Sequence, residues 1–171
     1  MSRSPLFRWA GLAAAAAVFA ADQASKAWIV HGLELPMRLS VPVLPGLNFT
    51  WVENRGITFG LLGGFGALGP VLLTAVALAV VAALGVWLWR AERWLPAVAL
   101  GAIAGGAVGN VLDRLRLGYV VDFLHAHALG YSWYVFNVAD AAIVCGVAAL
   151  VFDGMRRSPP TDRLADPKGG R

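Results

Sequence analysis

Four long apolar segments constrain the fold of this chain more than any other feature of its sequence. They cover residues 7–30, 67–89, 95–112 and 138–152. An α-helix rises about 1.5 Å per residue, so about 20 apolar residues cross the ~30 Å hydrocarbon core of a bilayer. Each segment is therefore predicted to be a transmembrane helix, and the chain to be an all-α membrane protein with four transmembrane helices.

The composition agrees with lipid as the main solvent. Of the 171 residues, 58% are hydrophobic and 14% are charged, whereas a soluble domain carries about 25% charged residues. The net charge is +4, but the basic residues flank the apolar segments instead of forming a stripe. This distribution favours membrane flanks over a nucleic-acid-binding surface, so no nucleic-acid partner is expected.

The basic flanks also predict the orientation of the helices. They occur before the first segment, between the second and third, and after the fourth, which is one side of the membrane if four helices alternate. The positive-inside rule assigns that side to the cytoplasm, with both termini there and with residues 31–66 and 113–137 outside. The basic residues concerned are Arg3, Arg8, Arg90, Arg93, Arg156, Arg157, Arg163, Lys168 and Arg171.

The first segment has two possible interpretations. Two arginines, an alanine-rich run and small residues before Asp22 are also typical of a cleavable signal peptide. The apolar run resumes after Lys26 and continues to residue 30, which favours a retained helix. Residues 1–156 are then expected to form a single membrane-embedded domain. The Pro-, Gly- and charge-rich residues 157–171 are predicted to be a disordered cytoplasmic tail.

The outer segments contain patterns of extended structure. Residues 47–53 alternate apolar and polar side chains, and residues 119–124 form a second candidate strand. A small extracytoplasmic β-sheet or loop cradle is therefore predicted. Within the third helix, Gly101, Gly105 and Gly109 recur every four residues, which predicts close packing against another helix.

Six ionisable residues lie within or beside the apolar segments, where a charge costs about 2.5–3.5 kcal/mol at mid-helix. All of them map to the outer ends of their segments or to the outer loops, which predicts a polar site near one membrane face. Four of them are acidic, and they come from separate segments. The six are Asp22, Lys26, Asp113, Arg114, Asp122 and Asp140.

Two of the local pairs have simple structural explanations. Asp22 and Lys26 are four residues apart, so they share a helix face, and they either anchor the helix as an ion pair or help to shape the polar site. Asn137 fits an N-cap with Asp140 at the third helical position, which by itself explains both residues. Asn110 and Asp113 also share a helix face, and their role is expected to be positioning.

Asp122 lies in the apolar run YVVDFL and has no basic neighbour in sequence. A carboxylate there is desolvated unless another group meets it, and Asp140 follows one loop later. Two carboxylates held close together share a proton. One can then act as general base on water while the other, protonated, polarises a carbonyl group. This reasoning predicts an aspartic dyad.

Alternative functions remain open at this point. His125 and His127 together with Asp122 could bind a divalent metal ion, although an H-x-H pair on a strand is a weak motif. Buried carboxylates also serve proton-coupled transporters, which place them near the membrane midplane and not at the ends of helices. A scaffold without chemistry is a further alternative.

Four short motifs occur in order along the chain. They read DQASK at 22–26, NRGITFG at 54–60, GGAVGNVLDR at 105–114 with GYVVDF at 118–123, and FNVADAAI at 136–143. In residue types and order they resemble the motifs of the lipoprotein signal peptidases, the type II signal peptidases of bacteria. The family often has small residues after the glycine of the second motif, whereas Ile57 and Thr58 follow it here, which leaves the shape of the substrate groove open.

The resemblance implies an aspartic endopeptidase of the bacterial cytoplasmic (inner) membrane, with its active site near the extracytoplasmic face. Its substrate would be a diacylglyceryl-modified prolipoprotein, cleaved just before the lipidated cysteine. No cofactor or metal would be needed, membrane lipids would surround the protein, and a monomer is expected. By residue, the resemblance implies Asp122 and Asp140 as catalytic, Asn54, Gly56, Asn110, Asp113, Arg114 and Asn137 as supporting, and Asp22 and Lys26 as structural.

Overall fold

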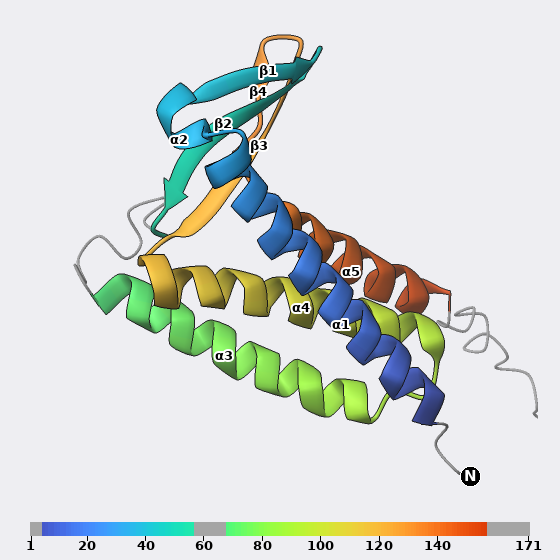
Figure 1. Cartoon of the computed structure of the whole chain (residues 1–171). Coiled ribbons are helices and arrows are strands. Elements are labelled where there is room, and N and C mark those ends of the chain that lie inside the picture. Colours follow the sequence, from blue (N-terminus) through green and yellow to red (C-terminus); the bar gives the residue numbers. More distant parts are fainter. Residues whose placement is uncertain (1–4, 57–67, 157–171) are drawn as a thin grey trace, which may run out of the picture.

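The computed structural model describes residues 5–56 and 68–156. Long helices form a bundle, and a small sheet rises from one end of it (Figure 1). Ile57, Thr58 and the tail predicted for 157–171 lie outside the described residues. The long helices are α1 (Pro5–Ala27), α3 (Leu68–Trp89), α4 (Trp94–Leu117) and α5 (Val138–Met155).

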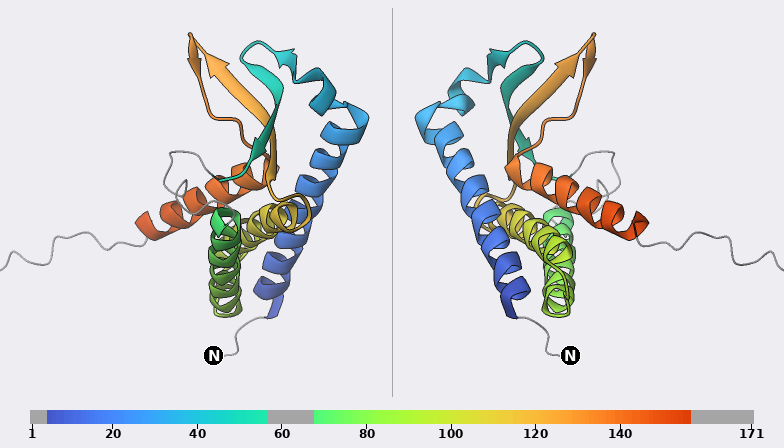
Figure 2. Two further views of the ribbon diagram at one scale, coloured as in Figure 1. Left: turned by 90° about the vertical axis from the view of Figure 1, so that its left-hand side faces the viewer. Right: turned by 90° about the vertical axis from the view of Figure 1, so that its right-hand side faces the viewer.

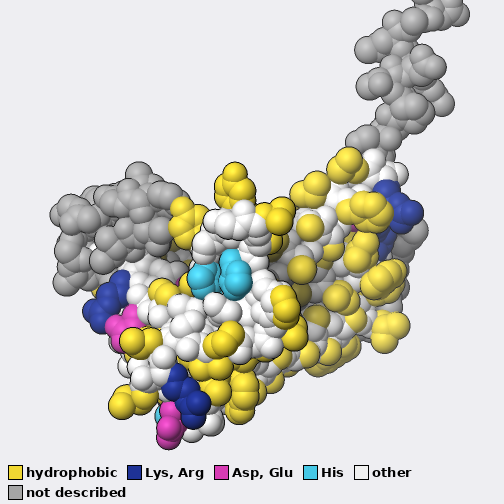
Figure 3. Space-filling view, turned by 90° about the horizontal axis from the view of Figure 1, so that it is seen from above, with side chains coloured by type: hydrophobic (Ala, Val, Ile, Leu, Met, Phe, Trp, Pro, Cys, Tyr) yellow, Lys and Arg dark blue, Asp and Glu magenta, His cyan; other side chains and the backbone are white. Residues whose placement is uncertain are grey.

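Three of these helices are long and apolar enough to cross a membrane, among the residues that the structure describes. These candidate spans are Val71–Trp89, Trp94–Leu117 and Val138–Met155. Helix α1 is also 23 residues long, but Asp22, Gln23 and Lys26 lower the hydropathy of its last two turns. Hydrophobic side chains cover much of the face seen in Figure 3, and charged side chains lie in a few small groups.

Glycines let α4 approach two other helices closely. A Cβ atom at Gly101 would collide with the carbonyl oxygen of Gly11 in α1, and one at Gly105 with the carbonyl oxygen of Ala15. On another face of α4, a Cβ at Gly106 would lie 2.6 Å from the carbonyl oxygen of Ala139 in α5. Figure 2 shows α1 and α5 diverging on either side of α4. The predicted packing role of the glycine stripe is confirmed.

Helix α1 continues directly into a π-helical turn, η1 (Trp28–Gly32), and a short helix, α2 (Leu35–Arg38), follows. Ile29 in η1 and Leu35 in α2 are fully buried. They pack with Val121 and Phe123 in one hydrophobic core cluster. This cluster joins the end of α1 to the sheet, so the sheet is held against the bundle by apolar burial.

The sheet has four antiparallel strands in the order β1-β2-β3-β4. The predicted strand at 47–53 is confirmed as β2, and the one predicted at 119–124 is confirmed but runs four residues further, to Ala128. In the central pair, Val52 of β2 lies opposite Asp122 of β3. The strands are β1 (Ser40–Leu44), β2 (Leu47–Asn54), β3 (Val120–Ala128) and β4 (Tyr131–Ser132).

Helix α4 runs further than the apolar segment that predicted it. The segment was expected to end at residue 112, with the outer loop beginning at Asp113, but α4 continues to Leu117, so the helix face expected for Asn110 and Asp113 is confirmed. Gly118 ends it in the left-handed conformation (φ 81°), where a residue without a Cβ is favoured. The helix continues through the charged residues because a buried lysine pairs with Asp113, as described below, a contact that local hydropathy does not reveal.

Candidate active site

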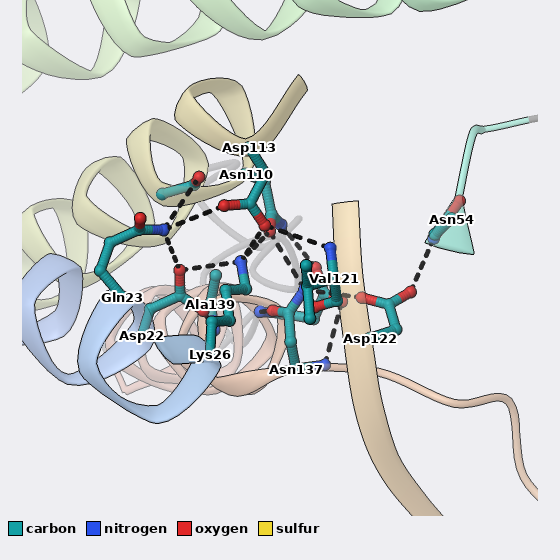
Figure 4. Close-up of polar contacts among 12 residues, drawn as sticks. Asp22, Gln23, Lys26, Asn54, Asn110, Asp113, Val121, Asp122, Asn137 and Ala139 are labelled. Atoms are coloured by element: carbon teal, nitrogen blue, oxygen red, sulfur yellow. Dashed lines mark hydrogen bonds and ion pairs between the residues drawn. The ribbon is translucent and has the colours of Figure 1, made fainter. Parts of the chain in front are cut away.

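Asp122 is the third residue of β3, and its side chain is almost entirely buried, with 1% of its surface exposed. Two side-chain amides bind its carboxylate (Figure 4). Asn54 Nδ2 donates to Oδ2 at 2.8 Å, and Asn137 Nδ2 donates to Oδ1 at 2.7 Å. The amides come from the end of β2 and the start of α5, so three elements meet at this one carboxylate.

Asp140 lies in the first turn of α5, where the predicted capping box is confirmed. Asn137 Oδ1 accepts a hydrogen bond from the Asp140 N–H at 2.9 Å, and the Asn137 N–H donates to Asp140 Oδ2 at 3.4 Å. Asn110 Nδ2 of α4 donates to Asp140 Oδ1 at 2.8 Å. The carboxylate therefore caps its helix and also belongs to a network that reaches beyond that helix.

Asn137 connects the two carboxylates. Its side-chain nitrogen donates to Asp122, while its side-chain oxygen and backbone N–H both engage Asp140. Asn137 Nδ2 also donates to Asn110 Oδ1 at 3.1 Å. The two acids predicted to act together are thus brought to one site. At such a site the second ionisation is opposed by the first charge.

Burial raises the pKa of Asp122 from an ordinary value of 3.8 to about 6. The hydrogen bond from Asn54 acts in the opposite direction, because it stabilises the ionised form; the nearby charge of Asp140 raises the pKa further, and Asn137 lowers it. A carboxyl group that titrates near pH 6 can either hold or accept a proton close to neutral pH. General acid–base chemistry needs such a group.

A second buried cluster lies beside the first and contains Lys26. Its Nζ atom is 2.9 Å from Asp22 Oδ2 and 2.8 Å from Asp113 Oδ2, and Lys26 exposes only 4% of its surface. Gln23 Nε2 donates to the same two carboxylates, at 3.1 and 3.2 Å. Asp22 and Lys26 were expected either to anchor the helix as an ion pair or to help shape the polar site. They do form an ion pair, and Lys26 also contacts Asn110, which binds Asp140.

The two acids of this cluster hold the backbone next to the other two acids. Asp22 Oδ1 accepts the N–H of Ala139, which precedes Asp140, at 3.0 Å. Asp113 Oδ2 accepts the N–H of Val121, which precedes Asp122, at 3.2 Å. Each buried carboxylate thereby positions one neighbouring element of the site.

Two contributors were missed or underestimated from sequence. Gln23 was not singled out, and only its place within the first motif could have indicated a role. Gly109 was assigned to packing alone, but a Cβ there would lie 2.5 Å from Asp22 Oδ2. The glycine therefore also admits a buried carboxylate.

Gly56 and Arg114 occupy the rim of the site. The N–H of Gly56 donates to Asn54 Oδ1 at 2.9 Å, with Gly56 at a positive φ of 75°. A Cβ at this position would collide with Leu73 of α3. Arg114 is half-buried, and its Nε has no hydrogen-bond partner among the described residues. Its guanidinium lies within the electrostatic field of Asp140 and Asp122.

The histidines of β3, His125 and His127, make no hydrogen bond to Asp122 or Asp140 among the described residues. His125 Nδ1 lies 3.2 Å from Thr50 Oγ1, and His125 Nε2 lies 2.5 Å from Ser132 Oγ. Its ring centroid is 5.9 Å from that of His127. Within residues 5–56 and 68–156, no group of three or more His, Cys, Asp or Glu side chains is placed to hold a metal ion.

A cavity of about 470 Å³ lies beside the Lys26 cluster, at the sheet end of α1 and α4. Val121 lines it, and successive residues of a strand point to opposite faces, so the cavity is on the face of β3 away from the Asp122 carboxylate. It reaches Lys26 and Asp113 but neither Asp122 nor Asp140. Its other lining residues are Gln23, Ala27, Val30, His31, Pro36, Trp51, Glu53, Arg116, Leu117 and Tyr119.

Comparison with known proteins connects this site to a family. The model of a family described as signal peptidase (SPase) II matches residues 14–156. The chain is 52% identical over 155 residues to a protein named lipoprotein signal peptidase from Methylorubrum extorquens (strain PA1), covering 89% of this chain and 91% of the relative. A protein with the same name from Methylobacterium sp. (strain 4-46) is 46% identical, with 93% and 96% covered.

Solved structures agree with this assignment. A bacterial membrane enzyme determined by the in meso method at 2.3 Å resolution matches with a TM-score of 0.73 and 26% identity, covering 94% of each chain. Another, at 1.9 Å, matches with a TM-score of 0.73 and 27% identity, covering 86% of this chain and 94% of the other. The fold is therefore that of a membrane enzyme, and the chain belongs to the signal peptidase II family.

Proposed function

We propose that this protein is an aspartic endopeptidase that removes the signal peptide from diacylglyceryl-modified prolipoproteins. Cleavage falls just before the lipidated cysteine. The relatives named lipoprotein signal peptidase support the substrate class. The observation that carries the chemistry is the pair of carboxylates, Asp122 and Asp140, joined through Asn137 in a buried polar site.

Hydrolysis uses the two carboxyl groups in complementary protonation states. The ionised carboxylate takes a proton from water, whose oxygen attacks the scissile carbonyl carbon, while the protonated carboxyl donates to the carbonyl oxygen. In the next step the tetrahedral intermediate collapses and the C–N bond breaks. The leaving nitrogen takes the proton that the first carboxylate removed from water, and the second carboxylate regains its proton as the carbonyl group forms again. No covalent intermediate with the enzyme forms. The raised pKa of Asp122 supports its role as the protonated partner.

The supporting residues hold this pair and receive the substrate. Asn54, Asn110 and Asn137 donate N–H groups to the two carboxylates. Gly56 fixes Asn54, and Asp113 holds the start of β3. Arg114, whose half-buried guanidinium lies in the electrostatic field of Asp122 and Asp140, is the proposed contact for the substrate backbone.

The proposed setting is the bacterial inner membrane, with α1 as a fourth span, both termini in the cytoplasm and residues 1–156 forming one domain. The polar site and the sheet lie at one end of the bundle, which would be the extracytoplasmic end. A substrate carrying diacylglycerol is confined to the bilayer and reaches such a site by lateral diffusion. The sheet would then cover the scissile bond, and the monomer would contact lipid through α3 and α5.

Conservative replacements of the two acids test this function. Asp122→Asn and Asp140→Asn each keep the size of the side chain but cannot supply a carboxylate, so kcat/KM on a diacylated precursor should fall by about 10³-fold or more. Purified protein in detergent is assayed with diacylated and with unmodified precursor. Only the diacylated precursor should be cleaved.

The matched control for these variants is the double change His125→Ala with His127→Ala. It removes the histidines of the alternative metal site and should leave most activity, and a chelator should leave the wild-type enzyme active. Retained turnover in either aspartate variant would refute the dyad. Loss of activity in the histidine variant or with the chelator would favour a metal-dependent protease.

A further inference from the structure

Lys26 contacts more than the two carboxylates that neutralise it. Its ammonium group also donates a hydrogen bond to Asn110 Oδ1 at 3.1 Å, besides the ion pairs with Asp22 and Asp113. The group has three N–H bonds, and each has one of these three partners. Because the side chain is almost fully buried, water does not compete for these contacts. The orientation of the ammonium group is therefore set by protein atoms.

The contact with Lys26 determines which way the Asn110 amide points. The oxygen and nitrogen of an asparagine amide have nearly the same shape, so only their hydrogen-bond partners decide the orientation. An ammonium group can only donate, hence the atom that faces Lys26 must be the oxygen. Asn137 Nδ2 donates to the same oxygen at 3.1 Å. The Asn110 nitrogen is then left to face Asp140 Oδ1, at 2.8 Å.

The opposite orientation would lose every one of these contacts. The amide N–H bonds would then face the ammonium group of Lys26 and the amide nitrogen of Asn137, while the amide oxygen would face the Asp140 carboxylate. A buried carboxylate that meets an N–H is stabilised in its ionised form, whereas one that meets an oxygen is favoured in its protonated form. The orientation of one amide thus influences which acid ionises first.

We propose that Lys26 is a positioning residue of the dyad: by locking the Asn110 amide, it keeps an N–H on Asp140. Asp140 is then the carboxylate that stays ionised and acts on water, and Asp122 is the one that holds the proton. This inference rests on the proposed two-aspartate function and extends it. It gives Lys26, in the first sequence motif, a part in deciding which of Asp122 and Asp140 holds the shared proton, in addition to its structural ion pair.

Several other charges act on Asp140, and a test has to separate them from the amide. The charge of Lys26 itself favours an ionised Asp140 without any help from Asn110. A plain removal of Lys26 would therefore mix an effect of charge with an effect of orientation. The charged and titratable groups around Asp140 in the described residues are Asp122 of β3, Asp22 and Lys26 of α1, and Asp113 and Arg114 of α4.

A charge-balanced variant makes this separation possible. Combining Lys26→Met with Asp113→Asn removes one positive and one negative charge, and an asparagine oxygen can still accept the Val121 N–H. The pH dependence of kcat/KM is measured for this variant with Asn110 present and again with Asn110→Ala, alongside wild type and Asn110→Ala alone. The acid limb of this pH profile reports the group that must be ionised for activity. We expect the charge-balanced change to move this limb to higher pH by about one unit when Asn110 is present, and not to move it in the Asn110→Ala background.

The outcomes are distinct. An equal shift of the acid limb in both backgrounds would overturn the inference, because Lys26 would then act by its charge. The absence of a shift in both backgrounds would overturn it as well. Gln23→Ala is the matched control: it disturbs Asp22 and Asp113 without touching Asn110, so it should lower the unfolding temperature but leave the acid limb in place. A shift of the limb in Gln23→Ala would also overturn the inference.

A second variant covers the case in which the charge-balanced protein is not recovered folded. Lys26→Gln combined with Asp113→Asn is again charge-balanced; its glutamine keeps a polar side chain of similar length but allows either amide orientation, and the variant is measured in the same two backgrounds with the same criteria. The aspartate variants described above keep the two proposals apart. If Asp122→Asn or Asp140→Asn is active, the function itself fails; if both are inactive and the limb does not depend on Asn110, only the role of Lys26 fails.

Discussion

Asn54, Asn110 and Asn137 share one arrangement at the residue scale. Each holds its amide oxygen against a fixed donor: the Gly56 N–H for Asn54, the Lys26 ammonium for Asn110, and the Asp140 N–H for Asn137. Each then directs its amide nitrogen at Asp122 or Asp140. The site therefore presents oriented N–H donors to two buried acids, and among the described residues no cation forms an ion pair with either carboxylate.

The pH dependence of activity tests the effect of one such donor. Asn54→Ala removes a hydrogen bond that stabilises ionised Asp122, so the pKa of Asp122 rises above its value of about 6. In the proposed mechanism the active dyad keeps one proton, and the alkaline limb of kcat/KM follows the loss of that proton. The limb should therefore move to higher pH, by about 0.5–1 unit.

Asn48→Ala is the matched control for this change. Asn48 is also on β2 but lies opposite His125, away from the dyad. Its replacement should leave the alkaline limb where it is in wild type. A limb that moves to lower pH in Asn54→Ala, or that moves equally in both variants, would contradict the assigned role of Asn54.

At the scale of elements, the close packing of α1 on α4 determines where the acids meet. The glycine stripe of α4 brings the backbone of α1 near, and its last member, Gly109, lies against Asp22. Asp22 in turn holds Ala139 at the start of α5. Three helices are thus connected at one point, and Asp140 follows directly after it.

Gly109→Ala should separate these helices. The added methyl group would press on Asp22 Oδ2 in a packed interior, so the protein should lose about 1–3 kcal/mol of stability and much of its activity. Thermal unfolding in detergent and kcat/KM measure the two effects. Gly85→Ala in α3 is the matched control, because a Cβ at Gly85 meets no atom within 4 Å.

The control should itself be neutral or slightly stabilising, since alanine favours a helix over glycine by about 0.5–1 kcal/mol. Equal changes in stability in Gly85→Ala and Gly109→Ala would mean that the effect at residue 109 does not come from its contact with Asp22. The special role of this glycine in admitting Asp22 would then be wrong.

In the whole molecule, polar and apolar features are distributed along the long axis of the helix bundle. The buried acids, the sheet and the cavity beside the Lys26 cluster gather at one end of the helices. At the other end, Arg93 pairs with Asp153 and joins the start of α4 to the end of α5. Between the two ends, exposed apolar side chains such as Val71, Val76 and Val144 suit contact with lipid.

Thiol labelling tests this axis and the fourth span. In a Cys145→Ala background, Ser40→Cys in β1 should react with a membrane-impermeant reagent in intact spheroplasts. Glu92→Cys, between α3 and α4, should react only after permeabilisation. If α1 spans the membrane, Ser2→Cys should behave like Glu92→Cys. Labelling of Ser2→Cys together with Ser40→Cys would remove α1 from the set of spans.

Local patterns in the sequence were sufficient for much of the architecture. The length of apolar runs predicted helices α3, α4 and α5, alternation predicted β2 and β3, and the spacing of Asn137 and Asp140 predicted the capping box. Each of these rests on contacts within one turn or one strand, which sequence spacing describes directly. The convergence of the acids on one end was predicted from their positions at the ends of alternating apolar segments and in the loops between them.

Tertiary structure alone decided how the acids are held. Lys26 donates to Asn110, 84 residues away, and the Ala139 N–H donates to Asp22, 117 residues away. Such partners depend on how closely two helices pack, and no local period encodes that. The same contacts keep Asp113 within α4, where hydropathy had ended the helix. By itself the sequence determined which segments are long and apolar enough for a membrane and which acids lie beside them. Packing decided which donor faces each acid, because hydrogen bonds require a particular separation and orientation of groups from different elements.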